Sequence, residues 1–208
     1  MVSDVVCPWC VIGLGALDAA IARLGDEVAV DLSFHPFELN PDMPPEGENI
    51  AEHIGRKYGA PPEQMSANRA RIRDSAAAFG FEMRTGPESR IYNTFDAHRL
   101  LHWAAEHGKQ RALKERLFRL YFTEGGSPSN PEALVAAAVD VGLDGEAARE
   151  VLDSGRYADD VRAEERHWRA NGINAVPAFV INDKYLLMGG QPPEAFERAL
   201  RMIAADDR

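Results

Sequence analysis

Cysteine is scarce in this sequence, whose 208 residues include only Cys7 and Cys10. A secreted fold held together by several disulfides is therefore excluded, because such folds need a framework of paired cysteines. A zinc site would have to take its remaining two ligands from the six histidines, since there is no second cysteine pair. We therefore expect no metal, and interpret the two cysteines from their immediate surroundings.

Positive charge and long apolar runs are also in short supply. The net charge is −10, the pI is near 5.1 and the Lys and Arg residues are scattered, so we expect no nucleic-acid partner. No apolar run approaches the roughly 20 residues that span a bilayer, so we expect no membrane partner. The first residues do not resemble a signal peptide, which predicts a cytoplasmic location. The sequence enters its first apolar segment almost at Met1, so these expectations concern the printed residues alone.

Apolar periodicity predicts a β-α-β opening, a long helical block and a β-β-α ending. At this length the chain can bury a sizeable core, and one sheet interrupted by a helical insertion explains the order with fewer assumptions than two independent domains. We therefore predict a sheet-bearing domain made of residues 1–45 and 170–208, and a helical insertion at 46–169. The expected strands are 2–6, 28–37, 178–182 and 185–188, and the expected helices are 11–24, 50–58, 62–79, 94–107, 110–122, 131–141, 144–153, 156–169 and 193–203.

The segment Cys7-Pro8-Trp9-Cys10 stands where the first strand gives way to the first helix. At a helix N-terminus the unpaired amides and the helix dipole stabilise a thiolate, which lowers a cysteine's pKa from about 8.5 to about 3.5–7.5. Cys7 would then be the nucleophile, and Cys10, one turn into the helix, would resolve the mixed disulfide. Pro8 suits the first helical turn, and Trp9 would shape access to the sulfur. Half of a metal site and a pair of inert thiols are the alternative interpretations.

Val176-Pro177 directly precedes the predicted strand that begins at Ala178. Proline cannot donate a hydrogen bond to a sheet, and a cis bond at this position would create a sharp entry into the strand. A trans proline that simply starts a strand is the more common case for an arbitrary X-Pro pair. The combination with the cysteine motif is what favours the cis form here.

Three segments resemble the FrnE-like branch of the DsbA family, and the resemblance covers nearly the whole chain. It implies an α/β thioredoxin-like fold with a large all-helical insertion, a redox pair at the start of the first helix, and a cis-proline loop that faces it. It also implies thiol-disulfide oxidoreductase activity with no required cofactor. The three segments are Ser3-Asp4-Val5-Val6-Cys7-Pro8-Trp9-Cys10, Asn93-Thr94-Phe95-Asp96-Ala97-His98-Arg99 and Gly172-Ile173-Asn174-Ala175-Val176-Pro177-Ala178-Phe179-Val180-Ile181.

The resemblance further implies how the protein meets its partners, which would be protein thiols or disulfides, or glutathione as a co-substrate. Val176 and Pro177 would offer backbone groups to an extended peptide or to glutathione. Gly190 and Gln191 lie where related kappa-class glutathione transferases and hydroxychromene-carboxylate isomerases hold glutathione with a Ser-Asp pair, from which this sequence departs. A glutathione-dependent isomerase or transferase is therefore the alternative function. Those relatives have serine in place of the first cysteine, so Cys7 favours redox chemistry.

Two further features concern protons and metals. Many members of the family have a buried acid six positions before the first cysteine, where this sequence has Met1, so either Asp4 or Glu38 is expected to handle the proton if the first strand is complete. His98, His102 and Glu106 are spaced to share one helix face, as metal ligands can be. Hydrogen bonding or packing against the sheet is the more common use of such a face, and we favour it.

Overall fold

The structure, a computed structural model, describes residues 1–59 and 61–206 and contains a four-stranded mixed sheet. The strand order is β2-β1-β5-β6, with β1 (Val2–Ser3) parallel to β2 (His35–Pro36) and antiparallel to β5 (Ala178–Ile181). The β6 strand (Tyr185–Met188) pairs with β5 as a hairpin. The first and last parts of the chain therefore form one sheet, as the sequence predicts.

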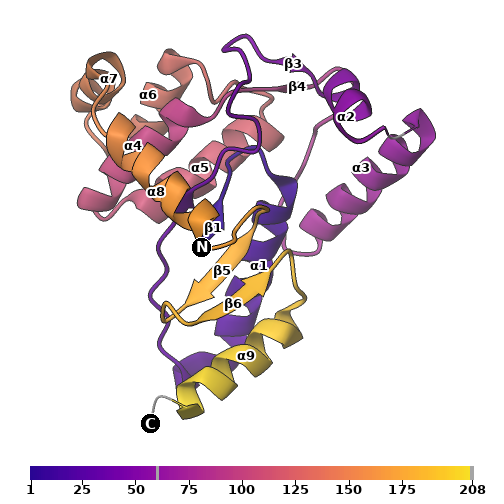
Figure 1. Cartoon of the computed structure of the whole chain (residues 1–208), viewed down its shortest axis with the longest axis vertical. Helices are drawn as coiled ribbons and strands as arrows, with labels where there is room; N and C mark the ends of the chain where they lie inside the picture. Colours follow the sequence, from indigo (N-terminus) through magenta and orange to yellow (C-terminus); the bar gives the residue numbers. More distant parts are fainter. Residues whose placement is uncertain (60, 207–208) are drawn as a thin grey trace.

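Two helices pack together against this sheet (Figure 1). They are α1 (Pro8–Leu24), followed by a 3-10 turn at Gly25–Glu27, and α9 (Pro193–Asp206). Within the described residues the stretch Pro8–Glu27 is long and apolar enough to cross a membrane by length and composition alone. The expectation that no apolar run approaches that length is therefore wrong. The run is apolar because α1 is a core helix, and half of this stretch is buried inside the protein.

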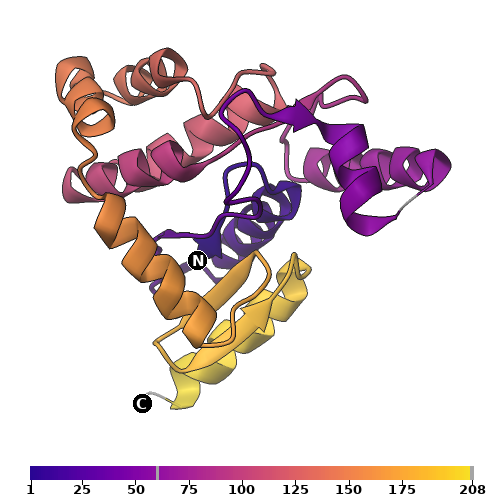
Figure 2. The same ribbon diagram turned by 45° about the horizontal axis from the view of Figure 1, so that its top comes forward.

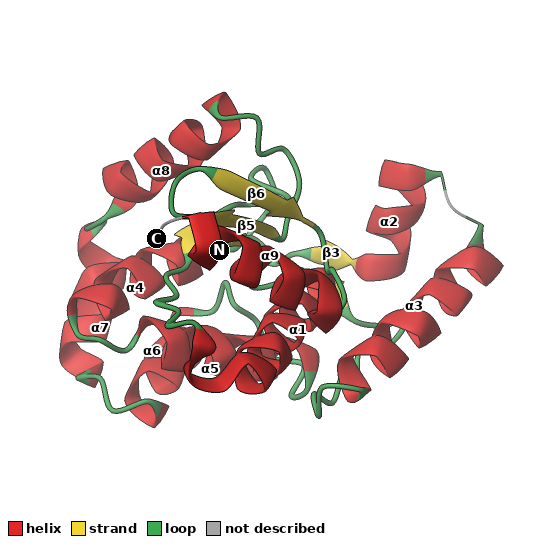
Figure 3. Cartoon of the chain, turned by 90° about the horizontal axis from the view of Figure 1, so that it is seen from below, coloured by secondary structure: helices red, strands yellow, loops and turns green. Residues whose placement is uncertain are grey.

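The helical block lies on two sides of α1 (Figures 1 and 2). On one side α2 (Ile50–Tyr58) and α3 (Pro62–Ala77) project away, next to a two-stranded sheet of β3 (Glu48–Asn49) and β4 (Arg90–Ile91). Seen from below, these two helices lie on the side opposite the other helices of the block, and α3 contacts α1 (Figure 3). The other side is a bundle of α4 (Phe95–Glu106), α5 (Gln110–Phe122), α6 (Pro131–Asp140), α7 (Gly145–Ser154) and α8 (Ala158–Ala170).

The strands differ most from the prediction. The expected strand 2–6 stops at Ser3, because the chain turns at residues 4–7, where the Cys7 amide donates to the Asp4 carbonyl oxygen at 3.3 Å. The expected strand 28–37 contributes only residues 35–36, since β1 offers partners to that length alone. The β3–β4 pair was not predicted, because two-residue strands carry no periodicity. The division at residues 46–169 stays a prediction.

Candidate active site

Cys7 and Cys10 occupy the first turn of α1. Cys7 is the N-cap residue, Pro8 begins the helix, and the Cys10 amide donates to the Cys7 carbonyl oxygen at 3.1 Å. Both thiols are free; Cys7 is 3% exposed and Cys10 is fully buried. The expected strand-to-helix junction is thus present, and of the two sulfurs only that of Cys7 has any access from outside.

The loop before β5 faces the Cys7 sulfur. The Val176–Pro177 peptide bond is cis, and the Cys7 thiol donates to the Val176 carbonyl oxygen at 3.6 Å. Gly13 lets α1 approach the loop, because a Cβ atom there would lie 3.1 Å from Pro177 Cγ and 3.2 Å from the Phe179 ring. Residues 169 positions apart in the chain are therefore brought together at one sulfur.

A groove of about 630 Å³ opens at Cys7 and runs between the start of α1, residues 37–41, α2, α3 and the loop 174–176. We call this hollow the cysteine groove. It contains five of the residues that the sequence singled out, namely Cys7, Pro8, Trp9, Glu38 and Val176. Gly190 lies against the Trp9 ring, with the position of a Cβ atom 3.2 Å away, but outside the groove's lining. Gln191 is exposed and donates its amide to the Met188 carbonyl oxygen at 2.8 Å, so it does not reach the sulfur side.

Three charged or titratable side chains are buried beneath the cysteine pair. Asp4 Oδ2 accepts the Leu39 amide at 2.8 Å, and Asp4 Oδ1 lies 3.4 Å from His98 Nε2. Burial alone would raise the pKa of Asp4, but the hydrogen bond and charge of His98, the Leu39 amide and the charge of Lys114 together lower it. Asp4 is therefore ionised at neutral pH, and groups from other segments hold it in place.

Lys114 comes from α5, and its side chain is fully buried beside the Phe118 ring, with Nζ 5.2 Å from the ring centroid. Burial lowers the pKa of Lys114 to about 8, against the charges of Cys10, Asp4 and Cys7, which favour its protonated form. Burial also raises the pKa of Cys10 well above its ordinary value, as does its hydrogen bond with Cys7, while Lys114 opposes the rise. The ammonium group thus favours a thiolate at the resolving cysteine.

Glu38 is the second buried carboxyl group, and it lines the cysteine groove together with Cys7. Burial and the neighbouring charge of Glu165 raise the pKa of Glu38 to about 7, although Arg162 pairs with its carboxylate. Of the two carboxyl groups expected to handle protons, Asp4 is ionised and enclosed, whereas Glu38 can gain or lose a proton near neutral pH. A group with such a pKa is suited to proton transfer.

The raised pKa of Glu38 predicts a pH-dependent stability. Between about pH 4.5 and 7 the folded protein holds a proton that the unfolded chain has released, so stability falls as the pH rises through this window. We expect the free energy of unfolding of the wild type to fall by at most about 3 kcal/mol across this window, and Glu38→Gln to abolish the fall. Urea unfolding at pH 4.5, 6 and 7.5 measures it. Glu63→Gln on the exposed surface of α3 is the control and should follow the wild type. Parallel curves for all three proteins would contradict this assignment.

The histidines with possible metal-ligand spacing point to different partners. His98 lies against Asp4 and the Phe37 carbonyl oxygen, His102 Nδ1 lies 3.3 Å from Glu164 Oε1, and Glu106 accepts a hydrogen bond from Tyr157. Within residues 1–59 and 61–206, no cluster of three His, Cys, Asp or Glu side chains is arranged to hold a metal ion. The helix face therefore serves hydrogen bonding, the more common use of such a spacing.

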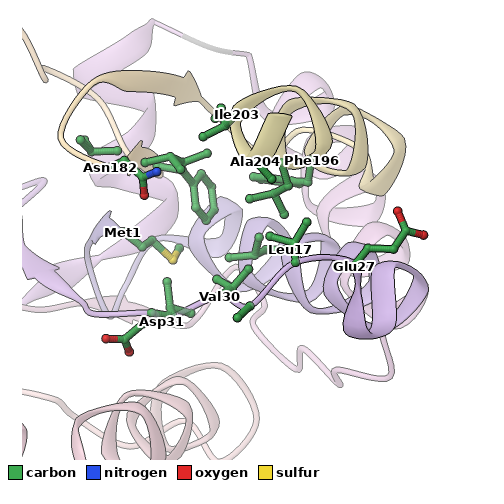
Figure 4. Close-up of a pocket in the computed structure, with 16 residues that line it drawn as sticks. Met1, Leu17, Glu27, Val30, Asp31, Asn182, Phe196, Ile203 and Ala204 are labelled. Atoms are coloured by element: carbon green, nitrogen blue, oxygen red, sulfur yellow. The ribbon is translucent and has the colours of Figure 1, made fainter. Parts of the chain in front are cut away.

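A second cavity, of about 330 Å³, lies at the other end of the sheet (Figure 4). Its walls come from α1, α9, β5 and residues 27–32, and Leu17 and Phe196 form part of its apolar lining. Neither cysteine contributes to it. Asp31 and Glu27 stand at its edges, and no thiol or other nucleophile lines it, so the chemistry of the chain is concentrated in the cysteine groove.

Sequence reasoning did not identify Lys114 and assigned His98 only to a helix face. A signal for Lys114 was present, since it lies between Leu113 and Leu117 within the buried stripe of α5. A lysine at an apolar phase of an amphipathic helix is rarely buried without a charged neighbour. That neighbour, however, comes from the opposite end of the chain, and its identity could not be read from the local pattern.

Comparison with known proteins gives a consistent result. A family model described as a DSBA-like thioredoxin domain matches residues 1–201. A probable DsbA oxidoreductase from Streptomyces coelicolor has 36% identity and a TM-score of 0.92, covering 100% of this chain and 89% of that one. The YwbO protein of Bacillus subtilis is 29% identical over 95% of this chain and 92% of its own length.

A solved structure of the cytosolic disulfide reductase DsbM from Pseudomonas aeruginosa with GSH has 18% identity and a TM-score of 0.62, and covers 98% of this chain and 97% of that one. At this identity the likeness concerns the fold. The sheet order, the cysteine pair at the start of α1 and the match over residues 1–201 agree with one another. The chain belongs to the family of DsbA-like thioredoxin domains.

Proposed function

We propose that this protein is a thiol-disulfide oxidoreductase in which Cys7 is the nucleophile and Cys10 the resolving cysteine. The observation that carries the proposal is the placement of the Cys7 sulfur at the N-terminus of α1, facing Val176 at the end of an open groove. A helix N-terminus favours a negative sulfur, and a groove beside it gives a substrate access. The full burial of Cys10 supports its role as the partner that acts only within the protein.

In the reducing direction the Cys7 thiolate attacks one sulfur of a substrate disulfide. A bond forms between Cys7 and that sulfur, and the second substrate sulfur leaves as a thiolate. The Cys10 thiolate then attacks the Cys7 sulfur, which forms the Cys7–Cys10 disulfide and releases the first substrate sulfur. The protein is oxidised by two electrons and the substrate is reduced by two. The reverse sequence oxidises a substrate dithiol.

Cys10 must lose its proton before the second step, and its surroundings supply the means. Lys114 favours the thiolate electrostatically, and Glu38 has a pKa near 7 in the same groove as Cys7. We assign Lys114 as a positioning residue whose charge stabilises the Cys10 thiolate, and Glu38 as the group that exchanges protons at the Cys7 side of the groove. Asp4 holds Lys114 in its charged form and is itself held by His98.

Protein disulfides and glutathione are the proposed partners, with Val176 and Pro177 offering backbone groups beside Cys7, and no cofactor is needed for sulfur exchange. The structural neighbour solved with GSH supports glutathione as a co-substrate. With two cysteines and no disulfide framework, a reducing cytoplasm is the compartment we propose. A glutathione-dependent isomerase is the competing function, and the presence of a cysteine at position 7 favours exchange over it.

The proposal is tested by equilibrating the protein with glutathione buffers of graded oxidation and alkylating the remaining thiols. We expect both cysteines to become resistant to alkylation together as a Cys7–Cys10 disulfide forms. The change should be reversible and should have a single midpoint in glutathione redox potential. Intact-mass measurement counts the alkyl groups. A protein in which both cysteines stay alkylated across the whole range, or in which only glutathione adducts form, would not be a dithiol oxidoreductase of this kind.

A further inference from the structure

The cysteine groove differs in charge from the rest of the protein. The chain as a whole carries a net charge of −10. Among the described residues that line the groove, the only carboxylate is Glu38, and it is paired with Arg162. Against it stand five cationic side chains from three helices, namely Lys57, Arg69, Arg71, Arg73 and Arg169. A positively charged groove on a negatively charged protein attracts anions to the groove, because the rest of the protein surface repels them.

Two of these cations flank the reactive end. The Arg71 guanidinium lies 5.7 Å from the centroid of the ring of Trp9, which follows Cys7 by two residues. Arg169 lies over the Phe37 ring at 4.6 Å and donates to the Glu38 carbonyl oxygen at 3.2 Å. Both are fixed by contacts that leave their charge uncompensated by a carboxylate. A substrate that lies in the groove at Cys7 would therefore share it with two guanidinium groups that no carboxylate neutralises.

Arg69 and Arg73 lie four residues apart on α3, which places them on one face of the helix. Among residues 1–59 and 61–206 neither makes an ion pair or a side-chain hydrogen bond. Most other arginines of the chain pair with a carboxylate; Arg111, for example, pairs with Asp18 and Glu115. Two unpaired guanidinium groups in the groove that contains Cys7 are thus available to an anionic partner.

The lining of the groove is also partly apolar, and it includes Ile50 and Ile54 of α2 and Ile72 of α3. Glutathione offers carboxylates to such a groove but no apolar side chain to cover these isoleucines. A peptide segment offers both, and an extended peptide can lie beside Val176 with alternate side chains directed into the groove.

Resting on the proposed function, we propose that the cysteine groove selects peptide segments in which the reactive cysteine is flanked by acidic residues and followed by apolar ones. Exposed ion pairs contribute little individually, but a field of one sign raises association rates by about 10- to 10³-fold. The selectivity should therefore appear in kcat/KM and should weaken with salt. Glutathione disulfide, although anionic, should react more slowly than such a peptide.

The test uses two labelled peptides, each with one cysteine in a disulfide to a thiol dye and with two leucines downstream. They differ only in having two glutamates or two lysines beside the cysteine. We expect the reduced protein to react at least about 10-fold faster with the glutamate peptide at low ionic strength, and the difference to shrink at about 0.5 M salt. The single turnover uses the protein's own two thiols and needs no added reductant.

Matched charge reversals locate the effect. Arg69→Glu combined with Arg73→Glu should remove most of the preference for the glutamate peptide, because it cancels most of the positive charge of the groove. Arg166→Glu combined with Arg198→Glu makes the same change of charge on exposed parts of α8 and α9, outside the groove, and should keep the wild-type preference. Equal rates for the two peptides, or equal effects of the two double variants, would overturn the proposal. So would a faster reaction with glutathione disulfide.

The failure of this proposal is distinguishable from failure of the proposed function. A small neutral disulfide, bis(2-hydroxyethyl) disulfide, reports sulfur exchange without charge. If the wild-type protein reduces it but does not discriminate between the peptides, only the selectivity is wrong. If the wild-type protein reduces neither this compound nor either peptide, the oxidoreductase function itself is wrong, and the selectivity with it.

Discussion

Replacing Cys7 with serine is expected to abolish sulfur exchange, with a fall of more than about 10³-fold in the rate of disulfide reduction. A serine hydroxyl keeps its proton near neutral pH and cannot form a disulfide. Cys10 cannot substitute for Cys7, because it is fully buried and does not line the groove. The rate is measured with a chromogenic aromatic disulfide, which releases a coloured thiolate at each step.

The Cys10→Ser variant is expected to behave in the opposite way. The first step should proceed and the second should stop, so that a mixed disulfide between Cys7 and the substrate accumulates. Intact mass before and after a strong reductant detects it. Because a hydroxyl group in a fully buried site costs about 1–3 kcal/mol, Cys10→Ala serves as a second variant that should trap the same adduct.

Together the two cysteine variants separate exchange from glutathione-dependent isomerisation. An isomerase uses the sulfur of bound glutathione and would keep its activity in Cys7→Ser. An exchange enzyme loses everything in that variant and traps its substrate in the other. If Cys7→Ser kept its full rate, or if Cys10→Ser gave no adduct while folded, Cys7 would not be the nucleophile.

The fold was predicted best where local signals were complete. The bounds expected for the helices at 50–58 and 110–122 and for the strand at 185–188 agree with α2, α5 and β6. At α2 the side chain of Asn49 accepts the amides of Ala51 and Glu52, so the start of the helix is encoded in a single capping residue. Strands 2–6 and 28–37 were predicted too long, because pairing depends on partner strands that the local sequence does not specify.

The cysteine groove was predicted in part, for a related reason. Cys7, Pro8 and Trp9 are contiguous, and Val176 was recognisable from its neighbouring proline. The two segments that face each other at the Cys7 sulfur could therefore be predicted. Of the charges beneath and beside it, the sequence indicated Asp4 and Glu38 but not the others. Lys114 and His98 come from the bundle, and Arg69 and Arg73 from α3, and only the path of the chain brings these helices to α1.

Lys114 comes from α5 of the helical bundle, and its charge acts on Cys10. Its replacement is therefore the second change with a large expected effect. We expect Lys114→Met to slow the second, resolving step by about 10-fold or more at pH 7. An opposite charge nearby shifts a pKa by about 1–3 units, and each unit changes the thiolate fraction of Cys10 tenfold. Stopped-flow measurements with the chromogenic disulfide resolve the two releases of thiolate. In the variant, the rate of the second release should need a higher pH to reach the same value.

The same substitution is expected to leave the protein as stable as before, or more stable. The pKa of Lys114 is about 8 in the folded state and 10.5 in its ordinary surroundings, so the folded protein carries the ammonium at a cost of about 3 kcal/mol at pH 7. Wild-type stability should rise between pH 8 and 10.5, where the folded state releases its proton first. Methionine fills a similar volume without a charge, so the unfolding free energy of the variant should lack this rise.

A control separates the local charge from the overall charge. Lys109→Met removes one positive charge at the N-terminus of α5 and should change neither the second phase nor the stability between pH 8 and 10.5. Asp4 keeps the hydrogen bond from the Leu39 amide and its 3.4 Å contact with His98 when Lys114 is replaced, so this carboxylate still has partners. A Lys114→Met protein that is slower and also much less stable would be explained by damaged packing. One that is slower but equally or more stable shows that the buried ammonium is retained for the reaction of Cys10 and at the expense of stability.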